Sequence, residues 1–241
     1  MDMRSTGRTR GSGPTALLDR ATIRDIALVC LADALVGASF GAISVSGGLP
    51  VWVPVAMSVL VFAGGAQFAA VGVVLAGGGP AAAVVAGLVL NTRLLPFGFA
   101  VADVLGSRWS ALLPGAHVVT DESVAFALRE SDVGRRRAAF WTCAVALFLV
   151  WNVAVVAGAA AGRLISDTDA LGLDAAFPAV LLALVLPSLT RRTGPAAALG
   201  AVVALAATPF VSPGLPVLLA LVGLVLVVRR TAAEPTPAGE S

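Results

Sequence analysis

Residues 84–99 read VVAGLVLNTRLLPFGF, and this stretch decides the class of fold. Its one charged residue is Arg93, and the chain carries no other charged side chain between Asp33 and Arg93. A run of that length holds at least two passes through a bilayer, since one pass needs about 20 apolar residues. A guanidinium midway along such a pass costs about 3 kcal/mol or more against lipid. We therefore expect Arg93 to face protein or water, and it is the first candidate functional residue.

The composition of the whole chain agrees with this class. Of its 241 residues, 58% are hydrophobic and 12% are charged, about half the charged share of a soluble domain. Cys30 and Cys143 lie in apolar segments without a neighbouring histidine, so neither a metal site, a cofactor nor a disulfide framework is expected. The net charge is only +2, and the charged residues are scattered over loops and tails, so nucleic acid is not expected as a partner.

Glycine and proline turns divide the chain into apolar segments. The segments lie at about 26–47, 51–76, 81–105, 138–161, 175–190, 195–210 and 213–228. They predict an all-α fold, a polytopic membrane helix bundle of about 7–8 segments, some broken or short. Residues 1–22 are expected to form a disordered basic cytoplasmic tail, residues 23–229 the transmembrane domain, and residues 230–241 a disordered C-terminal tail.

The arginines predict the orientation, because basic loops stay in the cytoplasm. Basic clusters occur at Arg4, Arg8, Arg10, Arg20, Arg24, Arg135–Arg137, Arg191, Arg192, Arg229 and Arg230. We expect both termini in the cytoplasm and the protein in the plasma membrane. An even number of crossings must then precede Arg135, so residues 110–128 are expected to cross as well. That segment is too polar to meet lipid and is expected to be a buried, broken helix that lines a cavity.

Two opposite charges in separate apolar segments form the first candidate site. Asp33 and Arg93 are expected to pair across helices, with Asn91 close to the arginine. One interpretation is a structural ion pair that fixes helix packing. The other is a polar cavity that holds a charged substrate, since ionisable residues inside membranes usually mark a pathway.

Gly64 and Gly65 lie in the middle of the second segment and predict a helix break. Transporters use such breaks to aim backbone N–H groups at a carboxylate. Gln67 favours this interpretation, because a buried amide needs partners. The alternative is that these glycines, like Gly37 and Gly41, only allow close helix packing.

Asp121 and Glu122 are candidates for proton coupling, together with Asp33, or for binding a substrate ammonium group. The alternative is structural: Thr120 N-caps a helix that continues to Glu130, and the two carboxylates favour its first turn.

Gly37-Ala38-Ser39-Phe40-Gly41 matches the G-x-S-x-G pattern of serine hydrolases, which needs a strand, a turn and a helix that this apolar run does not offer. His117, the only histidine, is the one possible base, so an intramembrane serine protease that uses Ser39 and His117 is the enzyme alternative. We expect no catalytic residues, and Ser39 remains a candidate substrate-binding residue.

Several motifs resemble those of the AzlC-type branched-chain amino acid permeases. They are FGA at 40–42, GLPVW at 48–52, MSVLVFAGGAQF at 57–68, LNTRLL at 90–95, TDE at 120–122 and GLDAAFP at 172–178. The resemblance covers the chain from about residue 30 to the C-terminal apolar segment. In one departure, Leu94 stands where the family often has histidine after the intramembrane arginine, so proton coupling here would differ or use the carboxylates.

The resemblance implies a transporter, and not an enzyme, that exports branched-chain amino acids as the large subunit beside a small AzlD-type membrane subunit. It implies a carboxylate site at Arg93 and the glycine break, and an ammonium acceptor at Asp33 or Asp121. It also implies an apolar pocket near Phe40, Phe62 and Phe97. The alternative is a membrane subunit that only scaffolds another protein.

Overall fold

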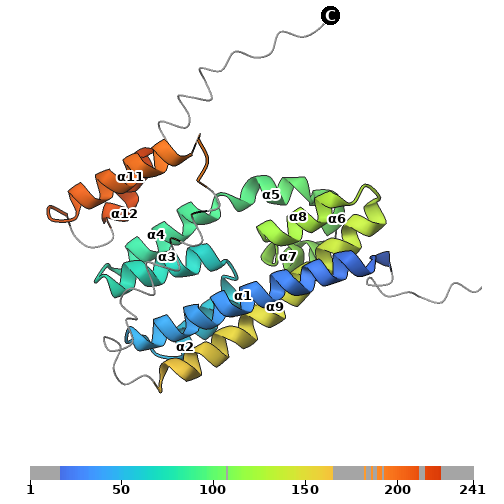
Figure 1. The fold of residues 1–241 in the computed structure, drawn as a ribbon, viewed down its shortest axis with the longest axis horizontal. Helices are drawn as coiled ribbons and strands as arrows, with labels where there is room; N and C mark the ends of the chain where they lie inside the picture. Colours follow the sequence, from blue (N-terminus) through green and yellow to red (C-terminus); the bar gives the residue numbers. More distant parts are fainter. Residues whose placement is uncertain are drawn as a thin grey trace, which may run out of the picture.

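The computed structural model describes residues 17–106, 108–164, 182, 186, 189–191, 193–211 and 215–223, and all regular elements in these residues are helices. They are α1 (Arg20–Ser46), α2 (Trp52–Leu60), α3 (Gly64–Leu75), α4 (Pro80–Asn91), α5 (Leu94–Ala100), α6 (Ala102–Leu105), α7 (Trp109–His117), α8 (Asp121–Arg129), α9 (Val133–Gly162), α11 (Gly194–Ala207) and α12 (Leu215–Leu219). Arg20–Ser46, Pro80–Ala100 and Val133–Gly162 are long and apolar enough to cross a membrane. The predicted all-α membrane bundle is confirmed (Figure 1).

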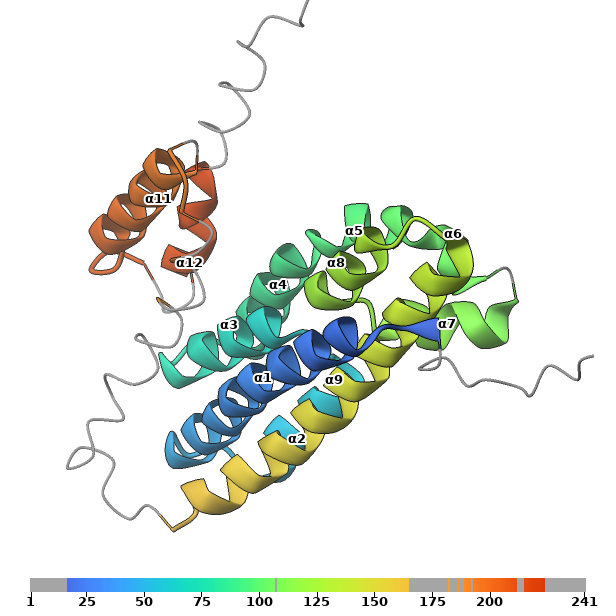
Figure 2. The same cartoon turned by 45° about the vertical axis from the view of Figure 1, so that its right-hand side comes forward.

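Helices α1 and α9 form the centre of the bundle and lie side by side in both views (Figures 1 and 2). They run parallel, since Gly37 faces Trp151 and Gly41 faces Val155 and Ala159. A Cβ at Gly41 would collide with the carbonyl of Val155, so the two backbones are in direct contact there. The prediction that these glycines serve close packing therefore holds for the α1–α9 interface.

The two long helices define the ends of the molecule. At the end where α1 and α9 begin, which we call the charged end, an ion pair of 3.7 Å joins Arg129 to Asp25. Arg135 contacts Glu130 at 2.6 Å and Arg136 contacts Asp103 at 3.0 Å at the same end. At the opposite end, which we call the far end, α1 stops at Ser46 and α9 at Gly162. Arg20 and Arg24 in α1 and Arg135 and Arg136 in α9 thus lie at the same end of the molecule. That this end faces the cytoplasm stays a prediction.

Helices α2 and α3 form a hairpin that enters from the far end and turns back at mid-length. In α2, the Ser58 hydroxyl lies 2.7 Å from Oδ1 of Asn152, halfway along α9. The helix stops at Leu60, and α3 returns so that Leu75 lies against Gly47 at the far end. Phe62, between the two helices, has a φ of 38°. The predicted break is confirmed, but the segment 51–76 does not cross as one helix.

Helices α4 and α5 then run from the far end to the charged end. Gly87 in α4 faces Ala66 in α3, and the carbonyl of Ala100 accepts a hydrogen bond of 3.1 Å from Arg136 at the charged end. The path is interrupted once at mid-length, where α4 stops at Asn91 and α5 starts at Leu94. Arg93 lies at this interruption.

Helices α7 and α8 form a second hairpin, which enters from the charged end. Gly106, just before α7, lies near Arg137, and α7 ends with His117 beside Phe148 in the middle of α9. Helix α8 returns from Asp121 to Arg129 at the charged end. The expectation that residues 110–128 cross the membrane is therefore wrong. Each arm has nine residues, about 13 Å at 1.5 Å per residue, which is half of a bilayer core.

The chain thus repeats one order of elements in opposite directions. Helix α1 crosses and is followed by the α2–α3 hairpin from the far end; α4–α5 crosses back and is followed by the α7–α8 hairpin from the charged end. The tips of the hairpins meet, since Nε2 of His117 lies 2.8 Å from the carbonyl of Val59. Two segments, α1 and α4–α5, cross before α9, where four were expected. The number of crossings is even, as expected. Opposed repeats of this kind place binding sites at mid-depth in transporters.

Helices α11 and α12 pack against each other after residue 193 (Figure 1). Residues 1–16 and 224–241 lie outside the described residues, and they include most of both predicted tails. Most of the predicted segment 175–190 also lies outside them, as do residues 167–174 before it. Helix α1 begins at Arg20, so residues 20–22, assigned to the tail above, are helical; Asp19 caps the helix by accepting a 2.8 Å hydrogen bond from the N–H of Thr22.

Candidate functional site

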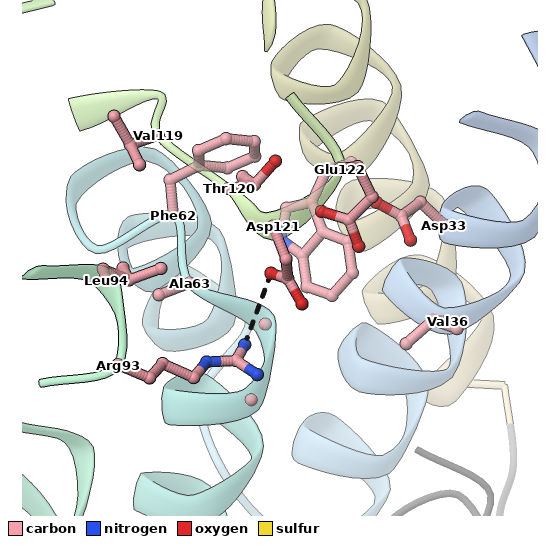
Figure 3. Close-up of a pocket in the computed structure, with 13 residues that line it drawn as sticks. Asp33, Val36, Phe62, Ala63, Arg93, Leu94, Val119, Thr120, Asp121 and Glu122 are labelled. Carbon is pink, nitrogen blue, oxygen red and sulfur yellow. Dashed lines mark ion pairs between the residues drawn. The ribbon is translucent and has the colours of Figure 1, made fainter. Parts of the chain in front are cut away.

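A pocket of about 190 Å³ lies where the two hairpin tips approach α1, α9 and the interruption between α4 and α5 (Figure 3). Its polar lining consists of Asp33, Arg93, Thr120, Asp121 and Glu122. These residues come from three parts of the chain that are far apart in sequence, at 33, 93 and 120–122, and the fold collects them at mid-length.

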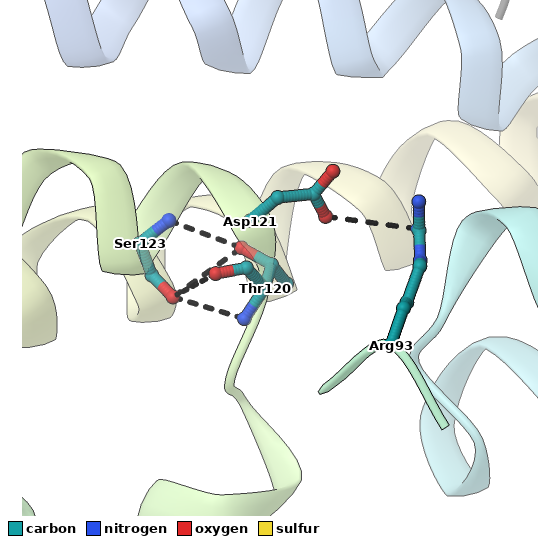
Figure 4. A network of polar contacts seen from close by, with 4 residues as sticks. All are labelled: Arg93, Thr120, Asp121 and Ser123. Atoms are coloured by element: carbon teal, nitrogen blue, oxygen red, sulfur yellow. Dashed lines mark hydrogen bonds and ion pairs between the residues drawn. The ribbon is translucent and has the colours of Figure 1, made fainter. Parts of the chain in front are cut away.

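Among the described residues that line the pocket, Arg93 is the only cation, and its partner is Asp121. Nη2 of Arg93 lies 3.7 Å from Oδ1 of Asp121, and both side chains are about half exposed, at 49% and 48%. Both residues sit at the start of a helix: Arg93 precedes α5, and Asp121 is the first residue of α8 (Figure 4). We expected Arg93 to pair with Asp33. Among the described contacts, its ion pair is with Asp121 instead. The arginine is open on one side and is not sealed in an enclosed chamber.

Asp33 and Glu122 form the acidic side of the same pocket. Figure 3 shows their carboxylates directed toward each other, Asp33 from α1 and Glu122 from the first turn of α8. With Asp121, the pocket holds three carboxylates and one guanidinium. Such a cluster favours the binding of a cationic group or of a proton, because like charges at close range disfavour one another.

The start of α8 carries a capping box formed by its own residues. The backbone N–H of Ser123 donates to the Thr120 hydroxyl at 3.2 Å, and the Ser123 hydroxyl accepts from the backbone N–H of Thr120 at 3.0 Å (Figure 4). Asp121 and Glu122 occupy the first turn, where carboxylates interact favourably with the helix dipole. The capping interpretation of Thr120 is thus correct, and it holds alongside the position of both carboxylates in the pocket.

The start of α3 lies at the same pocket and is uncapped. Its N-cap residue, Ala63, supplies no side-chain hydrogen bond, and the first turn holds no acidic residue. A Cβ at Gly65 would lie 3.5 Å from Nη2 of Arg93, and one at Gly64 would lie 3.0 Å from the indole of Trp151. A helix N-terminus with free N–H groups attracts anions. The two glycines let Arg93 and Trp151 approach it closely.

Three other predicted site residues lie apart from the polar pocket. Asn91 ends α4 and lines a separate apolar groove between α2, α3 and α4. Gln67 is fully buried in α3, and its amide has no hydrogen-bond partner among the described residues. The Ser39 hydroxyl donates to the carbonyl of Leu35 within α1, at 2.8 Å.

The structure does not bring Ser39 and His117 together. His117 is bonded to Val59 at the hairpin tips, and Ser39 lies inside a continuous helix. The strand-turn-helix context of a hydrolase nucleophile is therefore absent around Ser39. No cluster of metal-ligating side chains occurs in the described part of the chain.

Of the expected apolar residues, Phe62 lines the pocket, whereas Phe40 and Phe97 do not. Sequence reasoning missed the other apolar residues of the lining, which include Val36, Leu94, Val119 and Trp151. Trp151 is 4% exposed and stacks on Phe40, with 6.3 Å between the ring centroids. No sequence signal separates it from other aromatic residues in apolar helices, because its place in the pocket follows from the parallel packing of α9 on α1.

Opposed half-length hairpins, with charged groups and an open helix end where their tips meet, define a helical membrane protein of the transporter class. The model of the family described as "AzlC protein" matches residues 28–165, more than half of the chain, and the chain belongs to this family. The family is associated with branched-chain amino acid transport. No curated protein and no solved structure gave a significant match.

Proposed function

We propose that this protein exports branched-chain amino acids through the pocket between the hairpin tips, driven by protons and together with a small AzlD-type membrane subunit. The observation that supports this most is the uncapped start of α3, which faces three carboxylates across the pocket and has Arg93 beside it. An amino acid is a zwitterion, and it needs sites of both signs at short range. The pocket offers both.

The carboxylate of the substrate binds at the start of α3. The free N–H groups of its first turn and the guanidinium of Arg93, which lies next to Gly65, are the donors. The equivalent start of α8 is not available to the substrate, because Thr120, Ser123 and its own carboxylates already occupy it. This difference gives the substrate a single orientation.

The ammonium group of the substrate binds on the acidic side of the pocket, at Asp33 and Glu122. Asp121 is engaged by Arg93 and is the less available carboxylate. The aliphatic side chain then lies along Val36, Phe62 and Leu94, which line the same pocket. Apolar walls with a few convergent polar groups are typical of small-molecule sites.

Proton coupling uses the same carboxylates. A substrate ammonium and a proton compete for Asp33 and Glu122, since each neutralises the same cluster of charge. A proton that enters from outside then displaces the amino acid on that same side, and the protonated pocket returns to the cytoplasmic side. Leu94 supplies no titratable group to this scheme, so the carboxylates carry it alone.

Proteoliposomes that contain this protein and its small partner test the proposal. Efflux of labelled leucine should follow a pH gradient, and Arg93→Ala should lower the rate at least tenfold by an order-of-magnitude estimate. Arg108→Ala, which removes an arginine outside the pocket, is the matched control. Equal leucine flux from wild-type and Arg93→Ala vesicles would overturn the site. Impaired assembly of the two subunits, without any leucine flux in the wild type, would favour the scaffold alternative.

A further inference from the structure

We propose that His117 is a positioning residue: it ties the two hairpin tips together and so sets the short spacing between opposite charges that selects an α-amino acid. The inference rests on the proposed function and names the feature of the substrate that the site recognises. Nε2 of His117 lies 2.8 Å from the carbonyl oxygen of Val59. Val59 belongs to α2 and His117 is the last residue of α7, so this hydrogen bond joins the first hairpin to the second.

The hydrogen bond gives a carbonyl at mid-depth its partner. Val59 lies in the last turn of α2, where a helix leaves its carbonyl groups without intrahelical donors. No backbone N–H group in the described part of the chain donates to the Val59 carbonyl. A carbonyl can only accept, so Nε2 of His117 carries a proton, which the neutral ring and the imidazolium can both supply. Because a membrane core offers no water to replace the histidine, losing it leaves this carbonyl unpaired.

Aromatic packing fixes the imidazole in this position. Its ring centroid lies 6.3 Å from that of Phe62 and 5.9 Å from that of Phe148, and the two phenylalanine centroids are 5.0 Å apart. Phe148 belongs to α9, which therefore supports both hairpin tips. Phe62 lies in the link between α2 and α3, where it has the positive φ, and it lines the pocket. The histidine thus packs beside a residue of the pocket and beside the central helix.

The two partners of the hydrogen bond are close in sequence to the two halves of the site. Gly64, the first residue of α3, comes five residues after Val59, and Glu122 comes five residues after His117. Under the proposed function, the first half binds the carboxylate of the substrate and the second binds its ammonium group. The hydrogen bond between the tips limits how far apart these halves can move. An α-amino acid carries both charged groups on one carbon atom, so it fits halves that are held close together.

Leucine and β-homoleucine test this spacing. β-Homoleucine keeps the isobutyl side chain of leucine and has one more methylene between the carbon that carries the ammonium group and the carboxylate. The wild type, purified in detergent with its small partner, should bind leucine at least about tenfold more tightly than β-homoleucine, since one methylene has an effect of this size in a fitted site. Competition with labelled leucine measures both affinities.

His117→Phe keeps an aromatic ring beside Phe62 and Phe148 and removes the hydrogen bond. It should weaken leucine binding by about threefold to tenfold, the range for one hydrogen bond, and β-homoleucine binding by about twofold or less. The ratio of the two affinities therefore falls, whereas a purely structural role would weaken both ligands equally. His117→Leu also lacks the N–H group and gives the same test if the Phe variant does not fold.

His117→Gln is the matched control, because its side-chain amide can place an N–H group near the position of Nε2. It should keep the ratio of the leucine and β-homoleucine affinities within about twofold of the wild-type ratio, since the hydrogen bond can still form. A ratio that falls as far in the Gln variant as in the Phe variant would show that the hydrogen bond is not the cause, and it would overturn the inference.

The outcomes separate this inference from the proposed function. If the wild type binds no leucine, the proposed function fails and the inference fails with it. If the wild type binds leucine and β-homoleucine equally well, only the inference is overturned. It is also overturned if His117→Phe keeps the wild-type ratio of the two affinities, whether it binds both ligands normally or loses both equally.

Discussion

Arg93 and Asp121 lie 3.7 Å apart at two helix ends that meet in the middle of the molecule, and neither is buried. Their pairing connects the interruption of the α4–α5 crossing to the start of the second hairpin. A pair that is half exposed is weak enough to exchange partners, which a substrate-binding arginine requires.

Asp121→Asn should change the free energy of unfolding by less than about 1 kcal/mol, because exposed ion pairs contribute little. Arg93→Gln should have an equally small effect, and a double-mutant cycle should give a coupling energy below about 1 kcal/mol. Equilibrium unfolding in detergent measures all three variants. A coupling energy above about 2 kcal/mol would show that the ion pair mainly stabilises the fold.

The two glycines at the start of α3 should differ in their response to alanine. Gly64→Ala places a Cβ 3.0 Å from the Trp151 indole, which stacked packing holds in place, whereas Gly65→Ala gives an ordinary contact of 3.5 Å with a flexible arginine. We expect Gly64→Ala to weaken leucine binding by about tenfold and Gly65→Ala by about threefold or less, since only the first displaces packed atoms. Competition with labelled leucine measures both, and the reverse order would contradict this geometry.

The α1–α9 interface should not tolerate a side chain at Gly41. The added Cβ of Gly41→Ala meets the backbone of Val155 and Ala159, so the helices must separate. We expect a loss of about 1–3 kcal/mol and a lower melting temperature in detergent. Gly79→Ala is the control, because no atom lies within 4 Å of a Cβ there. Equal melting temperatures for the two variants would show that the interface is looser than described.

The cap of α1 should make stability depend on pH. Hydrogen bonds from Thr22 lower the pKa of Asp19 below its ordinary value. A carboxylate with a depressed folded-state pKa stabilises the fold above its unfolded-state pKa, and this contribution disappears as the pH falls through the folded-state pKa. Asp19→Ala should therefore lower the melting temperature at pH 7, and the difference from the wild type should shrink in acid.

Asp19→Asn provides the control for this cap, since asparagine also caps helices and does not titrate. Its melting temperature should lie above that of Asp19→Ala at neutral pH and should show no acid-dependent convergence from this site. A difference between wild type and Asp19→Ala that is constant down to low pH would contradict the role of the carboxylate.

The sequence predicted the membrane class, the break at Gly64 and Gly65 and the two groups of charge around Arg93 and Asp121. Each depends on local composition: a long apolar run, a glycine pair or an ionisable residue where lipid excludes it. The direction of the chain after each break was beyond the sequence. Residues 110–128 could cross or turn back at His117 with the same apolar pattern, and only contacts such as that of Arg129 with Asp25 decide it.

The members of the pocket were predictable only in part. Asp33, Arg93, Asp121 and Glu122 were found because charge is rare in this chain, and the fold collects all four. Gln67, equally rare in its segment, is buried and does not line the pocket, although it lies only two residues after Gly65. Trp151 was missed because aromatic residues are common in apolar helices.

The glycine contacts between α1 and α9 determine which parts of this protein can move. Backbones in direct contact at Gly41 and Gly158 leave no room for sliding, so we expect α1 and α9 to move as one rigid unit. Under the proposed function, any exchange of access between the two sides of the membrane then depends on the half-length hairpins, which are anchored at opposite ends and tilt relative to α1 and α9.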